Sequence, residues 1–192
     1  MAHGTAPQEE LPLSVPTPDT LPPVEFAEPR TGSPLYTIVE SPIGEILLTS
    51  DGESLTGVFM APQAGWNAQI GTDWRRDPAT FHTIEEQLRA YFAGELREFS
   101  VPLAPHGTPF QRRVWQALTT VPYGHTASYG AIASAIDRPS ASRAVGAANG
   151  RNPISIVVPC HRVVGADGSL TGYGGGLPRK RHLLALEQQR AN

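Results

Sequence analysis

The chain has 192 residues, a formal net charge of −3 at pH 7 and one cysteine. This length suits one compact domain or two small ones. A single cysteine excludes an intramolecular disulfide and a multi-cysteine zinc site, so nothing in the sequence calls for an oxidising compartment. No apolar run reaches the roughly 18 to 20 residues of a membrane span, and the start of the chain lacks a signal-peptide pattern. We expect a cytoplasmic or nucleoid-associated protein.

Charge is divided unevenly along the chain. Residues 1–105 hold 5 Lys and Arg against 15 Asp and Glu, a net charge of −10, whereas residues 106–192 hold 10 against 3, a net charge of +7. A basic half beside an acidic half is typical of an anion-binding module joined to a scaffold, although solvated surface charge gives the same asymmetry. The split therefore leaves a nucleic-acid partner open without requiring one.

The first 33 residues have a composition of their own. Seven prolines lie among acidic and small residues, and the apolar residues follow neither a helical nor a strand period. Such a composition offers little apolar surface to bury. We expect residues 1–33 to form a disordered or extended tail.

The segment after the tail is predicted to be a scaffold domain over residues 34–105. Apolar residues from Phe81 to Phe92 recur at helical spacing and stop at Gly94, which predicts an amphipathic helix. Three β-rich runs bounded by turn residues precede it and predict an antiparallel meander that the helix covers on one face. These runs lie at residues 36–39, 45–49 and 55–60.

The remaining segment, residues 106–192, is predicted to be mostly helical. Thr108 and Pro109 are typical of a helix start, and the apolar stripe behind them ends before Pro122. Two short helices around a tight turn then predict a helix-turn-helix. They span residues 128–136 and 140–150, on either side of Asp137-Arg138-Pro139.

One face of the second short helix carries almost no side chains. Arg143, Gly146, Ala147 and Gly150 share that face at helical spacing. Such a face permits the close approach of a partner, and tight packing against another helix is the alternative explanation. Two glycines cost helix stability by roughly 0.8 to 1 kcal/mol each relative to alanine, so some contact must compensate them.

The segment from Ile154 to Val164 is an apolar run that we predict to be a strand, with Cys160 near its end. Residues 165–168 are turn residues, and residues 169–173 are predicted to return as the second strand of a hairpin, one candidate for a wing beside the helix-turn-helix. A last helix begins at Pro178.

Two residues in these elements are candidates for chemistry. Cys160 stands beside His161 and Arg162, and cationic neighbours favour the reactive thiolate. An unpaired cysteine is also a common inert core residue. Glu187 shares the inward face of the last helix with its leucines, where a carboxylate needs a partner unless it lies at the solvent margin.

Several strings in the basic half carry a resemblance to the O6-alkylguanine-DNA alkyltransferases. It extends over about residues 35–190 and is strongest over 108–187. It implies an α+β fold, with a small N-terminal antiparallel sheet-plus-helix domain of the ribonuclease H-like type and a mostly helical C-terminal domain of the winged helix-turn-helix type. The strings are Arg143-Ala144-Val145-Gly146, Asn152-Pro153, Pro159-Cys160-His161-Arg162-Val163 and Gly172-Tyr173-Gly174-Gly175-Gly176.

The resemblance implies direct, irreversible DNA repair in a single turnover. An alkylated guanine, with O4-alkylthymine as a further substrate, is flipped out of the duplex, and its alkyl group passes to the protein's own cysteine as a thioether. By this resemblance Cys160 is the acceptor, His161 its general base acting through a water, and Glu187 the carboxylate that supports His161. Tyr129 protonates the leaving guanine, and Asn152 orders the active-site turn.

Because successive residues of a strand point to opposite faces, Cys160 and His161 cannot simply stand side by side in one. A bridging water or a bend at Pro159 must connect them. The triad-like order of carboxylate, histidine, water and thiol also turns Glu187 into an expected partner of His161.

The resemblance also implies how DNA is held. The second short helix enters the minor groove through Arg143, Ala144, Gly146 and Ala147, with Tyr129 beside them, and Arg143 fills the stack left by the base. Minor-groove readout is degenerate, so little sequence specificity is expected. The alkyl pocket is formed by Tyr173, Gly174, Val163 and Pro159.

The resemblance implies neither a cofactor nor a metal in this chain, and a monomer that leaves cooperative binding along DNA open. Family members that hold zinc do so in the N-terminal domain, which here lacks cysteines. Two positions depart from the family pattern. Asp137 stands where glycine is frequent, which implies a strained or altered turn, and His125 stands where relatives are frequently acidic.

Two other classes of protein share parts of this pattern. A damage-recognition or regulatory protein would bind the lesion without transfer, although the retained Cys160 argues against it. A cysteine hydrolase of the papain type would turn over repeatedly, which a stable thioether precludes. Repeated cleavage of an acyl or amide substrate distinguishes the hydrolase, and tight lesion binding without alkylated protein distinguishes the regulator.

Overall fold

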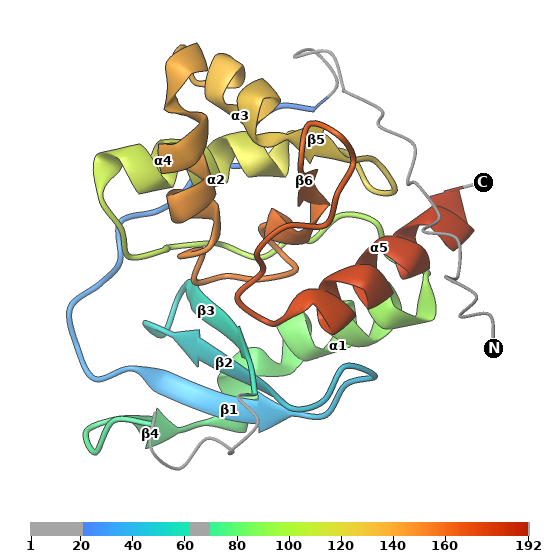
Figure 1. The fold of residues 1–192 in the computed structure, drawn as a ribbon. Helices are drawn as coiled ribbons and strands as arrows, with labels where there is room; N and C mark the ends of the chain where they lie inside the picture. The colour runs from blue at the N-terminus through green and yellow to red at the C-terminus, as the bar shows by residue number, and fades with distance from the viewer. Residues whose placement is uncertain (1–20, 62–69, 192) are drawn as a thin grey trace, which may run out of the picture.

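The computed structural model describes residues 21–61 and 70–191 as an α+β fold. A small sheet lies at one end of the molecule and the helices α2 (Pro109–Thr119), α3 (Tyr129–Ala135) and α4 (Ser142–Asn149) lie at the other (Figure 1). The helices α1 (His82–Ala93) and α5 (Leu177–Ala191) run beside each other along one side. One continuous cluster of buried apolar side chains extends through both halves of the chain. None of the helices in the described part is long and apolar enough to cross a membrane.

The predicted meander is present as β1 (Leu35–Val39), β2 (Ile46–Ser50) and β3 (Leu55–Met60). Both pairings are antiparallel, with Ile38 opposite Leu47 and Leu48 opposite Val58. A fourth strand, β4 (Arg75–Arg76), pairs in parallel with the outer edge of β1. A strand of two arginines has no alternation of apolar and polar residues, so the sequence pattern does not predict it.

The predicted helix is α1 (His82–Ala93), preceded by the 3-10 turn η1 (Pro78–Phe81). Ile84, Leu88 and Tyr91 are its buried residues, which is the stripe that the spacing predicts. Each buried aliphatic side chain of this size contributes roughly 1.5 to 3 kcal/mol. The helix ends where Gly94 adopts a left-handed conformation, with φ of 75°.

The second half begins with α2 (Pro109–Thr119), whose predicted start is a capping box. Thr108 Oγ1 accepts from Gln111 N at 3.3 Å, and the Gln111 side chain accepts from Thr108 N at 2.9 Å. The helix-turn-helix follows as α3 (Tyr129–Ala135), a 3-10 turn η2 (Pro139–Ala141) and α4 (Ser142–Asn149).

Asp137 closes α3 in a left-handed conformation, with φ of 58°. Its N–H donates to Ser134 O at 3.0 Å, and Arg138 N donates to Ala133 O at 2.9 Å, so the two bonds form a Schellman motif. Glycine adopts this conformation without a Cβ clash, whereas an L side chain is strained there. Asp137 therefore keeps the turn but strains it.

The predicted strand over residues 154–164 is wrong except at its C-terminal end. Cys160–Arg162 form a 3-10 turn, η3, and only β6 (Val163–Val164) is a strand. β6 pairs in parallel with β5 (Ala127–Ser128). The turn at residues 165–168 is present, but residues 169–173 form no return strand, so the predicted hairpin wing is wrong as well.

The free edge of β3 is covered by the segment that leads to Cys160. Val58 N donates to Pro153 O at 2.8 Å, and Ser155 N donates to Val58 O at 3.2 Å. An uncovered edge strand would present unpaired backbone groups. The sheet of the N-terminal half therefore anchors the loop that leads to Cys160 in the C-terminal half.

Residues 21–33 contain no helix or strand, but part of this segment is packed. Arg112 on α2 donates to the carbonyl oxygens of Phe26 and Ala27 at 3.3 and 3.1 Å, and its guanidinium lies over the Phe26 ring. Residues 26 and 27 are therefore held against α2. Residues 1–20 of the predicted tail lie outside the described residues.

Candidate active site

Cys160 is the first residue of η3 and is only 3% exposed. The chain bends at Pro159, which takes the N-cap position with φ of −82° and ψ of 62°. Cys160 N then donates to Val158 O at 2.8 Å, and Arg162 N donates to Pro159 O at 3.0 Å. In a 3-10 turn consecutive side chains are about 120° apart. The strict opposition of Cys160 and His161 expected of a strand therefore does not apply.

Asn152 ties together the two ends of the loop before Cys160. Its Nδ2 donates to Val158 O at 2.8 Å and its Oδ1 accepts from Ile154 N at 3.0 Å. Inside that loop Ile156 has φ of 73°, a left-handed conformation that is unusual for a β-branched residue. Backbone strain of this kind persists only where the surroundings enforce it.

The thiol of Cys160 is held in its neutral form. Burial raises its pKa above the ordinary value, and hydrogen bonds from Asn152 and Ser155 together with the charge of Lys180 offset this only in part. The prediction that cationic neighbours favour a resting thiolate is therefore not met. The thiol needs a base at the moment of reaction.

His161 is completely buried, and its Nε2 lies 2.8 Å from Glu187 Oε1. A carboxylate only accepts, so Nε2 carries the proton and Nδ1 keeps its lone pair. Nδ1 has no hydrogen-bond partner among the described residues. Burial lowers the pKa of His161 even though Glu187 raises it, so the imidazole is neutral at pH 7. A neutral imidazole with a free Nδ1 is a competent general base.

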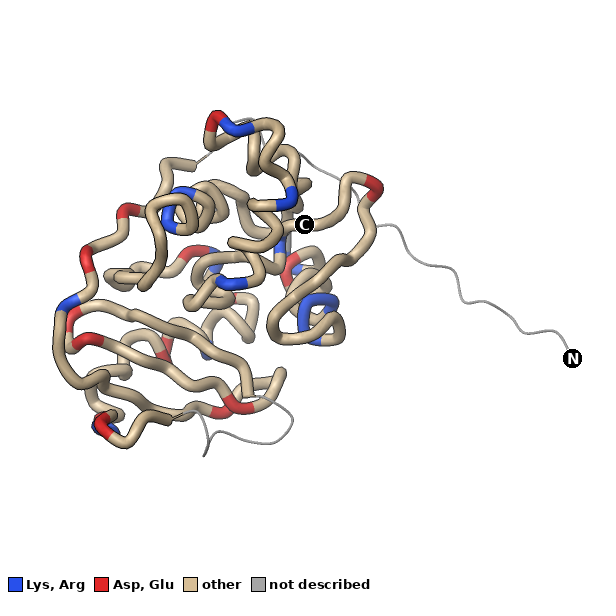
Figure 2. The backbone as a smooth tube through the Cα atoms, turned by 60° about the vertical axis from the view of Figure 1, so that its left-hand side comes forward, with Lys and Arg blue, Asp and Glu red and all other residues tan. Residues whose placement is uncertain are grey.

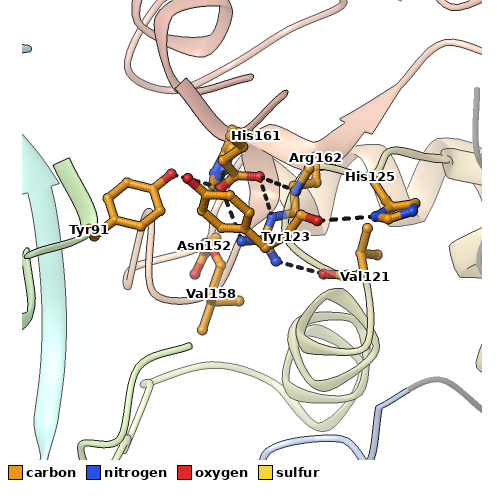
Figure 3. A network of polar contacts seen from close by, with 10 residues as sticks. Tyr91, Val121, Tyr123, His125, Asn152, Val158, His161 and Arg162 are labelled. Atoms are coloured by element: carbon orange, nitrogen blue, oxygen red, sulfur yellow. Dashed lines mark hydrogen bonds and ion pairs between the residues drawn. The ribbon is translucent and has the colours of Figure 1, made fainter. Parts of the chain in front are cut away.

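Glu187 is completely buried and accepts from several donors at once. Figure 3 shows the side chains of three of the residues that donate to it, Tyr91, His161 and Arg162. Burial raises its pKa, whereas His161 and Arg162 lower it, and the lowering prevails because the Arg162 charge is permanent. The carboxylate is therefore ionised across the physiological range. Oε1 accepts from Tyr91 Oη at 2.7 Å, His161 Nε2 at 2.8 Å and Arg162 Nη2 at 3.0 Å, and Oε2 accepts from Arg162 Nε at 2.9 Å and Gly124 N at 3.2 Å.

Two side chains of this network have no predicted role in the site. The sequence marks Arg162 only as a cationic neighbour of Cys160 and as part of a family string, yet its guanidinium donates to both oxygens of Glu187 and to Val121 O, the latter at 2.6 Å. The signal was available, because an arginine inside an apolar run needs a buried acid. Tyr91 was counted only in the apolar stripe of α1, and nothing local distinguishes its hydroxyl.

The predicted pocket residues lie in and after η3. Pro159 and Val163 are buried, Tyr173 is half-buried with a hydroxyl that lacks a hydrogen-bond partner among the described residues, and Gly174 is exposed. Lys180 on α5 (Leu177–Ala191) was missed. It is completely buried, and its Nζ donates to the carbonyls of Val163 and Thr171. Burial lowers the pKa of Lys180 to about 8.

The predicted DNA-binding residues lie on α3 and α4. Arg143, Ala144 and Ala147 are exposed, so the bare face does not serve tight helix packing. Gly146 faces the ring of Tyr129, where an added Cβ would stand 3.6 Å from the ring. Tyr129 Oη in turn accepts from Thr171 Oγ1 at 3.2 Å, which joins this surface to the pocket loop.

His125 lies outside this surface. It is half-buried in the loop before β5, and its Nδ1 lies 3.1 Å from Tyr123 O (Figure 3). Figure 2 shows most of the Lys and Arg residues at the helical end of the molecule and most of the Asp and Glu residues around the sheet, with some of each sign at either end. The charge asymmetry of the sequence is therefore an asymmetry in space.

Two models of one protein family match the chain. The ribonuclease-like domain of 6-O-methylguanine DNA methyltransferase matches residues 35–105, and the DNA binding domain of the same family matches residues 109–189. The chain belongs to this family. The resemblance drawn from the sequence motifs is thereby confirmed.

Curated members of the 6-O-methylguanine DNA methyltransferase family match almost their entire length. The methylated-DNA--protein-cysteine methyltransferase of Mycobacterium bovis is 56% identical over 156 residues, which cover 81% of this chain and 93% of the relative. That of Methanosarcina acetivorans is 54% identical over 153 residues, covering 79% and 97%.

Solved structures of the family confirm the predicted α+β fold class. Mycobacterium tuberculosis OGT in complex with DNA matches with a TM-score of 0.75 at 55% identity, covering 81% of this chain and 94% of that one. The O6-methylguanine-DNA methyltransferase of Pyrococcus kodakaraensis strain KOD1 matches with a TM-score of 0.59 at 27% identity, covering 80% and 98%.

Proposed function

We propose that this chain repairs DNA by transferring the alkyl group of O6-alkylguanine irreversibly to Cys160, one group per protein molecule. The buried chain of contacts that links Glu187, His161 and the turn carrying Cys160 is the observation that carries the proposal. Family membership supplies the reaction class, and the site supplies a thiol and a neutral base. O4-alkylthymine is a second candidate substrate.

The chemistry follows from the protonation states. We infer that His161 Nδ1 takes the thiol proton through a bridging water, while Glu187 stabilises the imidazolium that forms. The sulfur attacks the alkyl carbon, the S–C bond forms as the C–O6 bond breaks, and a thioether remains. Tyr129 donates its hydroxyl proton to the departing guanine and recovers one from His161 through solvent, so the protons balance.

The target oxygen is inaccessible inside a base stack, so the nucleotide must be flipped out, at a cost of a few kcal/mol. We propose that α4 enters the minor groove, where Ala144, Gly146 and Ala147 allow close approach and Arg143 fills the vacated stack. The exposure of Arg143, Ala144 and Ala147 supports this placement. Tyr173, Gly174, Val163 and Pro159 would line the alkyl pocket.

The proposed organisation is a tail over residues 1–33, a scaffold over 34–105 and a DNA-binding and alkyl-transfer unit over 106–192. We propose that the protein acts in the cytoplasm as a monomer without cofactor or metal, because one chain holds every group that the reaction uses. If the basic half contacts DNA phosphates, the affinity for DNA should fall as the salt concentration rises. An affinity that does not change with salt would contradict a role of the basic half in DNA binding.

Intact mass after incubation with duplex DNA that contains O6-methylguanine tests the function. We expect one added methyl group on the wild type and none on Cys160→Ala. An unmodified wild type, or a Cys160→Ala protein that still gains the methyl group, would refute the proposal. Tight lesion binding without an adduct would instead support a damage-recognition protein.

A second experiment separates the role of Arg143 from the chemistry. Arg143→Ala should slow repair of duplex lesions far more than reaction with free O6-benzylguanine, because only the duplex leaves a stack to fill. Arg151→Ala is a matched control, an exposed arginine just beyond α4 that is not assigned to the stack. Equal losses on both substrates for Arg143→Ala would contradict the role.

A further inference from the structure

The N-terminal half sends one polar group into the active site. Tyr91 lies on α1, yet its hydroxyl donates to Glu187 Oε1 on α5 at 2.7 Å, and both residues are completely buried. Figure 1 shows α1 and α5 running beside each other, and Figure 3 shows the Tyr91 ring reaching the network from the side opposite to Arg162. Among the described residues, every other donor to Glu187 belongs to the C-terminal half.

Packing alone accounts for the ring of Tyr91 but not for its hydroxyl. The ring lies edge-on to Phe92 and Tyr123 and tilted against Phe99, with centroids 5.4 to 6.1 Å apart. A phenylalanine would fill the same space without a buried hydroxyl to satisfy. Burial raises the pKa of Tyr91 well above its ordinary value, so its hydroxyl keeps its proton and acts as a donor.

We propose that Tyr91 is a positioning residue for alkyl transfer, whose hydroxyl fixes the carboxylate oxygen of Glu187 that orients His161. The proposal rests on the function proposed above. It gives the ribonuclease-like half a part in the chemistry, because that half supplies a hydrogen-bond donor to Glu187, the carboxylate that holds His161. Tyr91 acts through Glu187 and touches no reacting atom.

The shared oxygen makes a directional prediction. Tyr91, His161 and Arg162 all donate to Glu187 Oε1, and each donor withdraws charge from it. Without the phenol, the carboxylate is a stronger base and pulls harder on the His161 proton. The pKa of His161 should then rise, and a larger fraction of the base should be protonated at a given pH.

The surrounding groups set the background for this titration. Arg162 and Lys180 oppose protonation of His161, whereas Glu187 favours it. These groups remain in place when only the Tyr91 hydroxyl is removed. Several titratable or charged groups of the described residues surround the pair. They are Cys160 and Arg162 from η3, Tyr173 from the segment before α5, Lys180 from α5, Tyr91 from α1 and Tyr123 from the loop after α2, with Arg97 and Arg190 beyond Tyr123.

Tyr91→Phe tests the proposal, with Tyr123→Phe as the matched control. The Tyr123 hydroxyl is buried in the same cluster but has no hydrogen-bond partner among the described residues, so its removal breaks no bond. The readout is the rate of methyl transfer from O6-methylguanine duplex, followed by intact mass from pH 5 to 9. Tyr91→Phe should react about tenfold more slowly at pH 7, and the acid limb of its profile should move up by about half a pH unit.

A second variant reverses the change. A tyrosine with fluorine beside the hydroxyl, incorporated at position 91, is a stronger donor, so the acid limb should move to lower pH. A Tyr91→Phe protein with unchanged rate and acid limb overturns the proposal, and so does one that only melts at a lower temperature. If the wild type itself gains no methyl group, the proposed function fails instead.

Discussion

The buried carboxylate of Glu187 gives the sharpest test of the active-site network. Glu187→Gln keeps the shape of the side chain but removes its charge. Both oxygens accept hydrogen bonds, Oε1 from three donors and Oε2 from Arg162 Nε and Gly124 N. Whichever oxygen becomes an amide nitrogen, its N–H groups face other donors. The Arg162 guanidinium also loses its counter-ion.

The magnitude follows from the burial of the pair. Removing one partner of a buried ion pair costs about 3 to 5 kcal/mol, because the remaining charge is uncompensated. The side chain of Arg162 is 8% exposed and that of Glu187 is fully buried, so solvent screens little of this cost. A chain of this size loses roughly 2 to 4 °C of melting temperature per kcal/mol. We therefore expect a fall of about 10 °C at pH 7, and methyl transfer slowed by about a hundredfold or more.

The way the loss of stability in Glu187→Gln changes with pH distinguishes the loss of a charge from a packing defect. Glu187 has a lowered pKa in the folded protein, so its stabilisation is fully present above the unfolded value of about 4.3 and is lost as the pH falls below it. The gap in melting temperature between wild type and Glu187→Gln should therefore narrow between about pH 5 and pH 2.

Thermal unfolding at pH 7 and at pH 3 measures the gap in melting temperature between wild type and Glu187→Gln. Glu98→Gln, at an exposed position of the N-terminal half, controls for the loss of one surface charge and should change stability by less than about 0.5 kcal/mol. A gap below 1 °C at pH 7, or one that does not change with pH, would refute the reasoning.

Three further predictions concern residues outside this network. Asp137→Gly should raise the melting temperature by roughly 2 to 4 °C, because it relieves about 1 kcal/mol of left-handed strain at φ of 58°; a lower melting temperature would show that the side chain stabilises the turn. The pKa of Lys180 is about 8 in the folded protein, whereas that of a lysine in the unfolded chain is about 10.4. Between these two pH values Lys180 therefore makes the free energy of unfolding rise with pH. Lys180→Met should remove that part of the slope in urea unfolding, and equal slopes would contradict it. Arg112→Ala should cost about 1 to 2 kcal/mol and speed amide exchange near Ala27, whose carbonyl accepts from it; unchanged exchange would mean that other contacts hold the segment.

The sequence correctly predicts those helices and strands whose position depends only on residues within or next to them. The stripe of Ile84, Leu88 and Tyr91, together with the left-handed Gly94, fixes the face and the end of α1. The Thr108 capping box likewise fixes the start of α2. These signals are local, so one sequence suffices to find them.

The segment around Cys160 was predicted as a strand because apolar β-branched residues dominate it. Its actual shape depends on contacts with distant residues. Asn152 holds Val158 O, the edge of β3 holds Pro153 and Ser155, and the chain can therefore bend at Pro159. Tertiary hydrogen bonds override the local propensity here, as is common at functional sites.

The site residues also divide into those that a sequence pattern marks and those that depend on contacts between distant residues. Cys160 and His161 could be named because they stand in a family motif, and Glu187 because a carboxylate on the inward face of the last helix needs a partner; His161 Nε2 lies 2.8 Å from its Oε1. The contact between Tyr91 and Glu187 joins residues 96 positions apart, and no pattern on α1 distinguishes a hydroxyl that donates from one that faces solvent. Such a contact follows only from the packing of α1 against α5.

The resting state of the site is consistent with a protein that acts once. Cys160 is 3% exposed and its pKa is raised by burial, so the thiol is neutral and shielded from electrophiles in solution. A permanent thiolate would react faster with the lesion, but it would also be consumed by other alkylating agents and oxidants. Because His161 is neutral and Glu187 is ionised, the proposed mechanism forms the thiolate only transiently, with the positive charge on His161 balanced by Glu187. In that mechanism, selectivity depends on which alkyl carbon lies beside the sulfur when the proton leaves.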